Sequence, residues 1–262
     1  MNPGGDNRRD RGTPAALSSA ELIVPDWPAP PGVQAIVTTR RGGASVGAFA
    51  SLNLGLRAGD DPLAVAENRR RLETCLPAPP RWLHQVHGNA VVPAHTVDNP
   101  PQADAAYTDR ANVVCSVMIA DCMPVLLCTD DGESVAAAHC GWRGLASGVI
   151  ERTLGAIGGD PQRVLAWLGP AIGPGAFEVG ADVRDAFIAV DPADASAFAA
   201  SGTVEGKWYA DLFELGRRRL ARAGVARVHG GGLCTVSDPQ RFFSYRRDRT
   251  TGRMAALIWR TG

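Results

Sequence analysis

Apolar and β-branched residues gather in short runs, separated by polar residues, Gly and Pro. Runs of this kind are typical of β-strands. We predict strands at 32–40, 163–169, 225–235 and 252–260, and three more between 111 and 140. Within that central stretch, Pro124 prevents a helix and marks a tight corner after Cys122, and 130–132 reads as a turn. The last central strand, 134–140, is dominated by small residues, which favours burial on both faces.

Four other segments carry apolar residues at helical spacing, at 61–76, 145–157, 180–190 and 209–224. Asp61 suits the N-cap of the first helix and Pro62 its first turn. Gly224 is a typical stop for the last one. Turn residues and polar residues predict loops at 41–55, 170–180 and 237–251. Strands and helices mix without strict alternation, which indicates an α+β fold or a mixed sheet.

Composition narrows the possible functions. The chain has 262 residues, a formal net charge of zero, and 45% hydrophobic and 21% charged residues. We therefore expect a globular protein with no general affinity for nucleic acid or acidic membranes. No apolar run reaches the roughly 18 residues of a membrane span. Residues 1–22 are polar, lack the apolar core of a signal peptide, and predict a disordered tail. We expect a cytoplasmic protein whose six cysteines are reduced thiols.

Candidate chemistry lies at His84 and His87, at Cys122, and at His139, which is predicted at a strand end just before a helix. A thiolate and two imidazoles suit zinc, and three protein ligands leave a position for water or substrate, as in catalytic sites. The pattern also fits an inert buried thiol, a core histidine, or a metal-free thiol–imidazole pair. Spacing alone does not separate these interpretations.

Nine motifs, however, occur in the order typical of the YfiH/laccase-domain family, which is related to the human laccase-domain protein. They are TTRRGGAS, SLNLG, NRRRL, HQVHG, ADAAYTD, ADCMPVLL, AHCGWRG, GPAIGPGAFEVG and FFSYRRD followed by TGRMAALIW. The resemblance covers about 33–260. It implies an α+β fold in which mixed β-sheets pack as a sandwich with flanking helices, in a single catalytic domain at 23–262.

The resemblance also implies a zinc site at His87, Cys122 and His139, with copper as another possible metal. His84 is then a packing residue or supports the site from outside. Cys140 stands where the motif usually has Ala, and we interpret it as a small buried residue. One Cys–His–His set cannot hold the four coppers of a multicopper oxidase.

The implied activity is phosphorolysis of adenosine, inosine and methylthioadenosine to the base and the pentose 1-phosphate, together with deamination of adenosine. The small-molecule partners are thus a purine nucleoside and phosphate. Which of the two reactions dominates, and whether zinc serves water activation or substrate orientation, stays open. The usual zinc-deaminase signature, H-x-E followed by P-C-x-x-C, is absent from the sequence.

Phosphate is best bound by arginine, because the guanidinium donates two parallel hydrogen bonds. The candidates are Arg40, Arg143, Arg246 and Arg247. The loop 42–51 is a further source of backbone N–H groups, and Asp121 either supports the metal ligands or fixes its own turn. Four aromatic residues are candidates for stacking a purine: Phe177, Phe242, Phe243 and Tyr245.

Two other hypotheses compete with the phosphorylase. In the first, the protein is a metal-free hydrolase of an amide, for example in the editing of peptidoglycan precursors. Cys122 would be its nucleophile and His139 its base. In the second, the protein is a metal-stabilised adaptor without enzymatic turnover.

Overall fold

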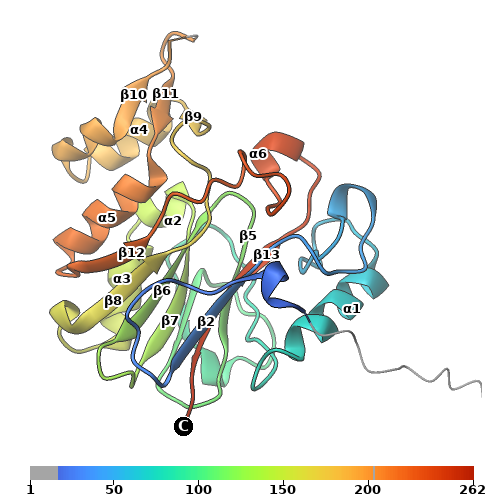
Figure 1. Ribbon diagram of the computed structural model, residues 1–262. Coiled ribbons are helices and arrows are strands. Elements are labelled where there is room, and N and C mark those ends of the chain that lie inside the picture. The colour runs from blue at the N-terminus through green and yellow to red at the C-terminus, as the bar shows by residue number, and fades with distance from the viewer. Residues whose placement is uncertain (1–16, 203) are drawn as a thin grey trace, which may run out of the picture.

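Two β-sheets face each other in the computed structural model, which describes residues 17–202 and 204–262 (Figure 1). The four-stranded sheet has the order β1 (Leu22–Ile23), β2 (Val33–Thr38), β13 (Met254–Arg260), β5 (Cys115–Ile119). The six-stranded sheet has the order β12 (Arg227–Gly230), β8 (Val164–Leu168), β6 (Met123–Thr129), β7 (Val135–Cys140), β4 (Ala105–Thr108), β3 (Val91–Pro93). A small third sheet contains β10 (Phe198–Ala200), β11 (Trp208–Ala210) and β9 (Glu178–Val179).

Alternating side chains divide the interior into three apolar layers, because successive residues of a strand point to opposite faces. Val125 and Leu127 of β6 belong to the layer beneath the helices, whereas Leu126 belongs to the layer between the two large sheets. On β13, Ala256 faces the same central layer, and Leu257 faces a third layer on the outside of the four-stranded sheet. Both large sheets are therefore covered on both faces.

Helices supply the outer covers of the sandwich (Figure 1). Leu72 of α1 (Pro62–Glu73) packs in the layer outside the four-stranded sheet. The outer face of the six-stranded sheet is covered by α3 (Val149–Ile157) and α5 (Leu212–Arg222), whereas α4 (Ala181–Ile188) packs beside the small third sheet. Two shorter helices are α2 (Trp142–Ala146) and α6 (Tyr245–Asp248). Single 3-10 turns lie at Ser19–Glu21, Gly47–Phe49, Ala94–Thr96, Pro161–Arg163 and Pro192–Ala197.

The predicted fold class is confirmed: the molecule is α+β, with mixed sheets packed as a sandwich and helices outside. All seven predicted strands are present, and Asp61 caps α1 by accepting a hydrogen bond from the backbone N–H of Leu63 at 2.9 Å. No helix of the described residues has the length and apolar character to cross a bilayer.

Some boundaries differ from the prediction. The helix predicted at 145–157 is two helices, α2 and α3, because Gly148 takes a left-handed backbone with φ of 89° between them. The loop predicted at 237–251 contains α6, and the loop at 170–180 contains β9. The predicted tail 1–22 falls mostly outside the described residues, but Ser19–Glu21 form a 3-10 turn and Leu22 begins β1.

Candidate metal centre and its cavity

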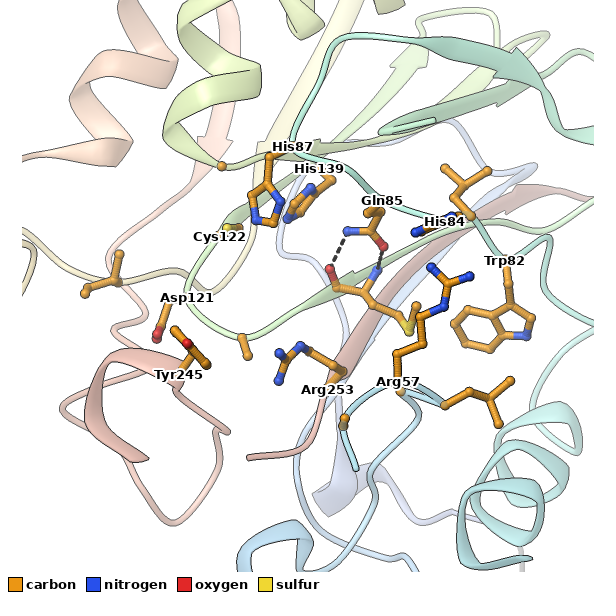
Figure 2. Close-up of a pocket in the computed structure, with 18 of the residues that line it drawn as sticks. Arg57, Trp82, His84, Gln85, His87, Asp121, Cys122, His139, Tyr245 and Arg253 are labelled. Carbon is orange, nitrogen blue, oxygen red and sulfur yellow. Dashed lines mark hydrogen bonds between the residues drawn. The ribbon is translucent and has the colours of Figure 1, made fainter. Parts of the chain in front are cut away.

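Three side chains from distant parts of the chain meet where β7 ends and β6 begins (Figure 2). His139 lies on β7, Cys122 directly precedes β6, and His87 lies in the loop before β3. One ligand atom from each lies within 4.8 Å of the others, and the two imidazole rings are 4.9 Å apart at 72°. Within residues 17–202 and 204–262, this is the one group of three or more side chains suited to a metal. The structure thus brings together the three predicted ligands.

Asp104 fixes both histidines from a fully buried position. Its Oδ1 accepts hydrogen bonds from His139 Nδ1 and from the backbone N–H of His87, both at 2.9 Å. Its Oδ2 accepts from the backbone N–H groups of Gly88 at 2.7 Å and Val86 at 3.2 Å. A carboxylate at Nδ1 selects the tautomer that leaves Nε2 of His139 free to bind a metal. The same bonds hold His87 in its left-handed conformation, with φ of 61°.

Asp121 fixes the corner that presents Cys122. Its Oδ1 accepts from the hydroxyl of Thr235 and its Oδ2 from the backbone N–H of Arg246, both at 2.6 Å. The bond from Arg246 ties the corner to α6, the bond from Thr235 ties it to the segment after β12, and Asp121 has a positive φ of 93°. Gly141 allows the backbone to pass close to Cys122, because a Cβ at this position would lie 2.9 Å from the sulfur of Cys122.

The electrostatics of the centre favour a thiolate. Burial raises the pKa of Cys122, but the charges and hydrogen bonds of His139 and His87 outweigh it and bring the pKa below its ordinary value. Burial alone would lower the pKa of His139, yet Cys122 and Asp104 raise it overall. Cys140, in contrast, has a pKa well above the ordinary value because it is buried. This agrees with its interpretation as a small buried residue.

A cavity of about 670 Å³ opens in front of the centre. His87, Cys122 and His139 line one end, and Arg57, Trp82 and His84 lie at the other in Figure 2, with Arg253 between them. Three further aromatic side chains line the cavity, Trp142, Phe177 and Tyr245, and Tyr245 lies beside Asp121 in Figure 2. Four arginines line the cavity: Arg57, Arg69, Arg246 and Arg253. Asp121 alone is acidic among the described residues that line it.

Of the four arginines predicted to bind phosphate, Arg246 lines this cavity and the other three do not. Arg40 donates from Nε to the carbonyl of Ala50 at 2.8 Å and from Nη1 to a second carbonyl, so its role is structural. Arg247 binds three backbone carbonyls and Asp248. Arg143 is exposed and stacks on Trp142. The geometry therefore supports only Arg246 from this set.

Of the four aromatic residues predicted to stack a purine, two line the cavity and two do not. Phe177 and Tyr245 line the cavity, whereas Phe242 and Phe243 are fully buried in the layer between the sheets. The loop 42–51 does not line the cavity. Several of its N–H groups are bound elsewhere, for example that of Ala44 to Asn68 Oδ1 at 2.6 Å.

Asp104, Gln85 and Arg253 were not predicted as site residues, although all three lie within the nine family motifs. The amide of Gln85 bonds both backbone groups of Met118, at 2.8 and 2.7 Å, and so fixes the start of the histidine loop (Figure 2). The signal was available for Asp104, because a buried acid next to apolar strand residues needs hydrogen-bond donors. No sequence pattern indicated that the side chain of Arg253 points into the cavity.

The fold and this centre define a class of α+β sandwich proteins in which one cysteine and two histidines gather at the end of a cavity. The chain belongs to the family described as multi-copper polyphenol oxidoreductase laccase, whose model matches residues 34–261. This confirms the family resemblance that the motifs indicated.

Relatives of known name match over nearly their whole length. Purine nucleoside phosphorylase YfiH of Escherichia coli is 51% identical over 92% of this chain and 99% of its own. Purine nucleoside phosphorylase PA4543 of Pseudomonas aeruginosa is 53% identical over 90% and 97%. The crystal structure of Neisseria meningitidis protein NMB0706 superposes with a TM-score of 0.90 at 49% identity. It covers 92% of this chain and all of that one.

Proposed function

We propose that the protein is a zinc-dependent purine nucleoside phosphorylase that also deaminates adenosine. Its substrates are adenosine, inosine and methylthioadenosine, which phosphate cleaves to the base and the pentose 1-phosphate. One observation carries the proposal: a His–Cys–His cluster closes one end of a cavity whose charged lining is four arginines and one aspartate. The relatives from Escherichia coli and Pseudomonas aeruginosa, both named purine nucleoside phosphorylases, support it.

The residues of the centre fit zinc. A thiolate and two imidazoles are ligands that zinc prefers, and the buried Asp104 on His139 is the partner that metal-bound histidines usually have. Bound at His87, Cys122 and His139, zinc would supply Lewis acidity at the inner end of the cavity. Copper shares these ligands, so metal analysis has to distinguish the two.

The cavity suits a purine nucleoside and an anion together. Trp142, Phe177 and Tyr245 offer aromatic surface on which a purine stacks. The excess of arginine favours a doubly charged phosphate over a second neutral reactant. Ile172 and Leu212, both buried, exclude water from the inner wall.

A second candidate function rests on a different feature of the same site. His139 lies between Cys122 and Asp104, in the order nucleophile, base and orienting acid that cysteine hydrolases use. In that case the Cys122 thiolate attacks an amide carbonyl, the amine leaves with a proton from His139, and water releases the acid. This reaction needs no metal.

The test starts with the metal content of the purified protein. Adenosine and inosine are then incubated with and without phosphate, and adenine, hypoxanthine, inosine and pentose phosphate are separated by chromatography. We expect base release only with phosphate, inosine formation from adenosine without it, and loss of both activities in Cys122→Ala and His87→Ala. Turnover that persists after chelation, with a covalent adduct at Cys122, would favour the hydrolase. Bound zinc without any turnover would favour the adaptor.

A further inference from the structure

We propose that Arg253 binds the phosphate cosubstrate, an assignment that rests on the proposed phosphorolysis. Arg253 directly precedes β13, and its side chain enters the cavity beside the metal centre (Figure 2). It forms no ion pair with any described residue. Buried arginines normally have an acidic partner, because carbonyls satisfy N–H groups but leave the charge uncompensated. Arg253 is partly buried, and a bound anion would supply the close counter-charge that it lacks among the described residues.

The free edge of the guanidinium has the right shape for an oxyanion. Nη1 donates to the carbonyls of Thr251 at 2.9 Å and Gly252 at 3.0 Å. Nε and Nη2 have no hydrogen-bond partner among the described residues. These two nitrogens form the edge of arginine that donates two parallel bonds to a phosphate. The carbonyls thus orient the group, and its binding edge stays free.

Packing holds this side chain in place before any ligand arrives. The backbone N–H of Arg253 donates to the side chain of buried Asn53 at 2.8 Å. A Cβ on Gly55 would lie 2.8 Å from Cγ of Arg253, so the aliphatic stem lies directly on that glycine. The guanidinium stands 6.0 Å from the ring centre of Tyr245. Such preorganisation reduces the entropy lost on binding.

The other arginines of the cavity are engaged differently. Arg69 uses both Nε and Nη2 on the carbonyl of Leu54 and stacks on Trp82. Arg246 uses Nη1 on the carbonyls of Ala176 at 3.4 Å and Glu178 at 2.9 Å and shares the open Nε–Nη2 edge, but its guanidinium stacks on Phe177, 5.3 Å from the ring centre. Arg57 is exposed, at the end of the cavity remote from the metal centre. Arg253 differs from both because it combines an open edge with a stem packed on Gly55, between the two ends of the cavity.

The position also suits the chemistry. Burial lowers the pKa of Arg253, and the negative charges of Cys122 and Asp121 act against this. In phosphorolysis, an oxygen of the phosphate held by Arg253 forms a bond to C1′ of the sugar. The bond from C1′ to the base breaks, and the base leaves with the electron pair and takes up a proton.

The experiment compares the wild-type protein with Arg253→Gln, Arg253→Lys and a control, Arg152→Gln, which removes an exposed charge on α3. Initial rates of inosine phosphorolysis are measured over a range of phosphate concentrations. We expect the KM for phosphate to rise about 30-fold or more in Arg253→Gln, as loss of a charge-assisted pair of bonds implies. The KM for inosine and phosphate-independent deamination should stay within about 3-fold.

Arg253→Lys should retain part of the phosphate affinity, and it replaces Arg253→Gln if that variant does not fold. An unchanged KM for phosphate would overturn the assignment, as would an equal loss of phosphorolysis and deamination. If the wild-type protein does not phosphorolyse at all, the proposed function fails, and calorimetry with inorganic phosphate decides the assignment separately. Binding to wild type but not to Arg253→Gln supports it; equal binding, or none to either, refutes it.

Discussion

Replacing Asp104 with Asn tests how the proposed metal centre is held together. The aspartate presents four acceptor positions to four donors, whereas an Asn of the same shape keeps one oxygen. Whichever way the amide turns, its NH₂ group faces N–H donors. If it faces His139, the imidazole must accept at Nδ1, which moves its proton to Nε2, the atom that should bind the metal.

Both the stability and the metal affinity should fall. Either the backbone N–H of His87 or those of Val86 and Gly88 lose their acceptor, and the charge-assisted character of the bond to His139 is lost. These two effects together cost ~3–5 kcal/mol of folding free energy. The metal affinity should fall ~10–100-fold, which is the usual effect of removing a residue that orients a metal-binding histidine.

The assay is a competition titration with a chromogenic zinc chelator, combined with denaturant unfolding of the metal-free protein. Asp194→Asn is the matched control. Asp194 is equally buried, but its bidentate partner is Arg222, outside the cavity. The control should lose stability and keep its zinc affinity. An Asp104→Asn protein that binds zinc within about 3-fold of wild type would refute the reasoning.

Three further predictions follow from the same geometry. Gly141→Ala places a methyl group 2.9 Å from the sulfur of Cys122, so zinc affinity should fall at least ~10-fold in the same titration, with secondary structure by circular dichroism unchanged. Gln85→Ala removes both bonds to Met118 and should lower the free energy of unfolding by ~1–3 kcal/mol in urea. Dialysis against a strong chelator should abolish base release, and zinc should restore it; activity in rigorously metal-free protein would contradict the zinc site.

Much of the architecture was predictable because its causes are local. The apolar run of β13 and the Asp61–Pro62 start of α1 depend on neighbouring residues only. The break at Gly148 was not predictable, since a glycine inside a helical pattern is compatible with a continuous helix.

In the candidate site, too, some features could be predicted from the sequence and others could not. His87, Cys122 and His139 stood out as residue types, but the sequence pattern left a metal, an inert thiol and a hydrolase pair open. Family resemblance selected the metal, and the fold brings the three together through the pairing of β6 with β7. Arg253 was missed because its orientation depends on Asn53 and Gly55, about 200 residues earlier in the chain.

The strand order of the four-stranded sheet has a consequence for folding during synthesis on the ribosome. β2 and β5 do not pair with each other, and both pair with β13, whose residues are made last of the three. Until residues 254–260 emerge, a nascent chain therefore carries two open strand edges and an uncovered apolar sheet face. Holdase chaperones should engage chains stalled before residue 254 and release them once that segment is added.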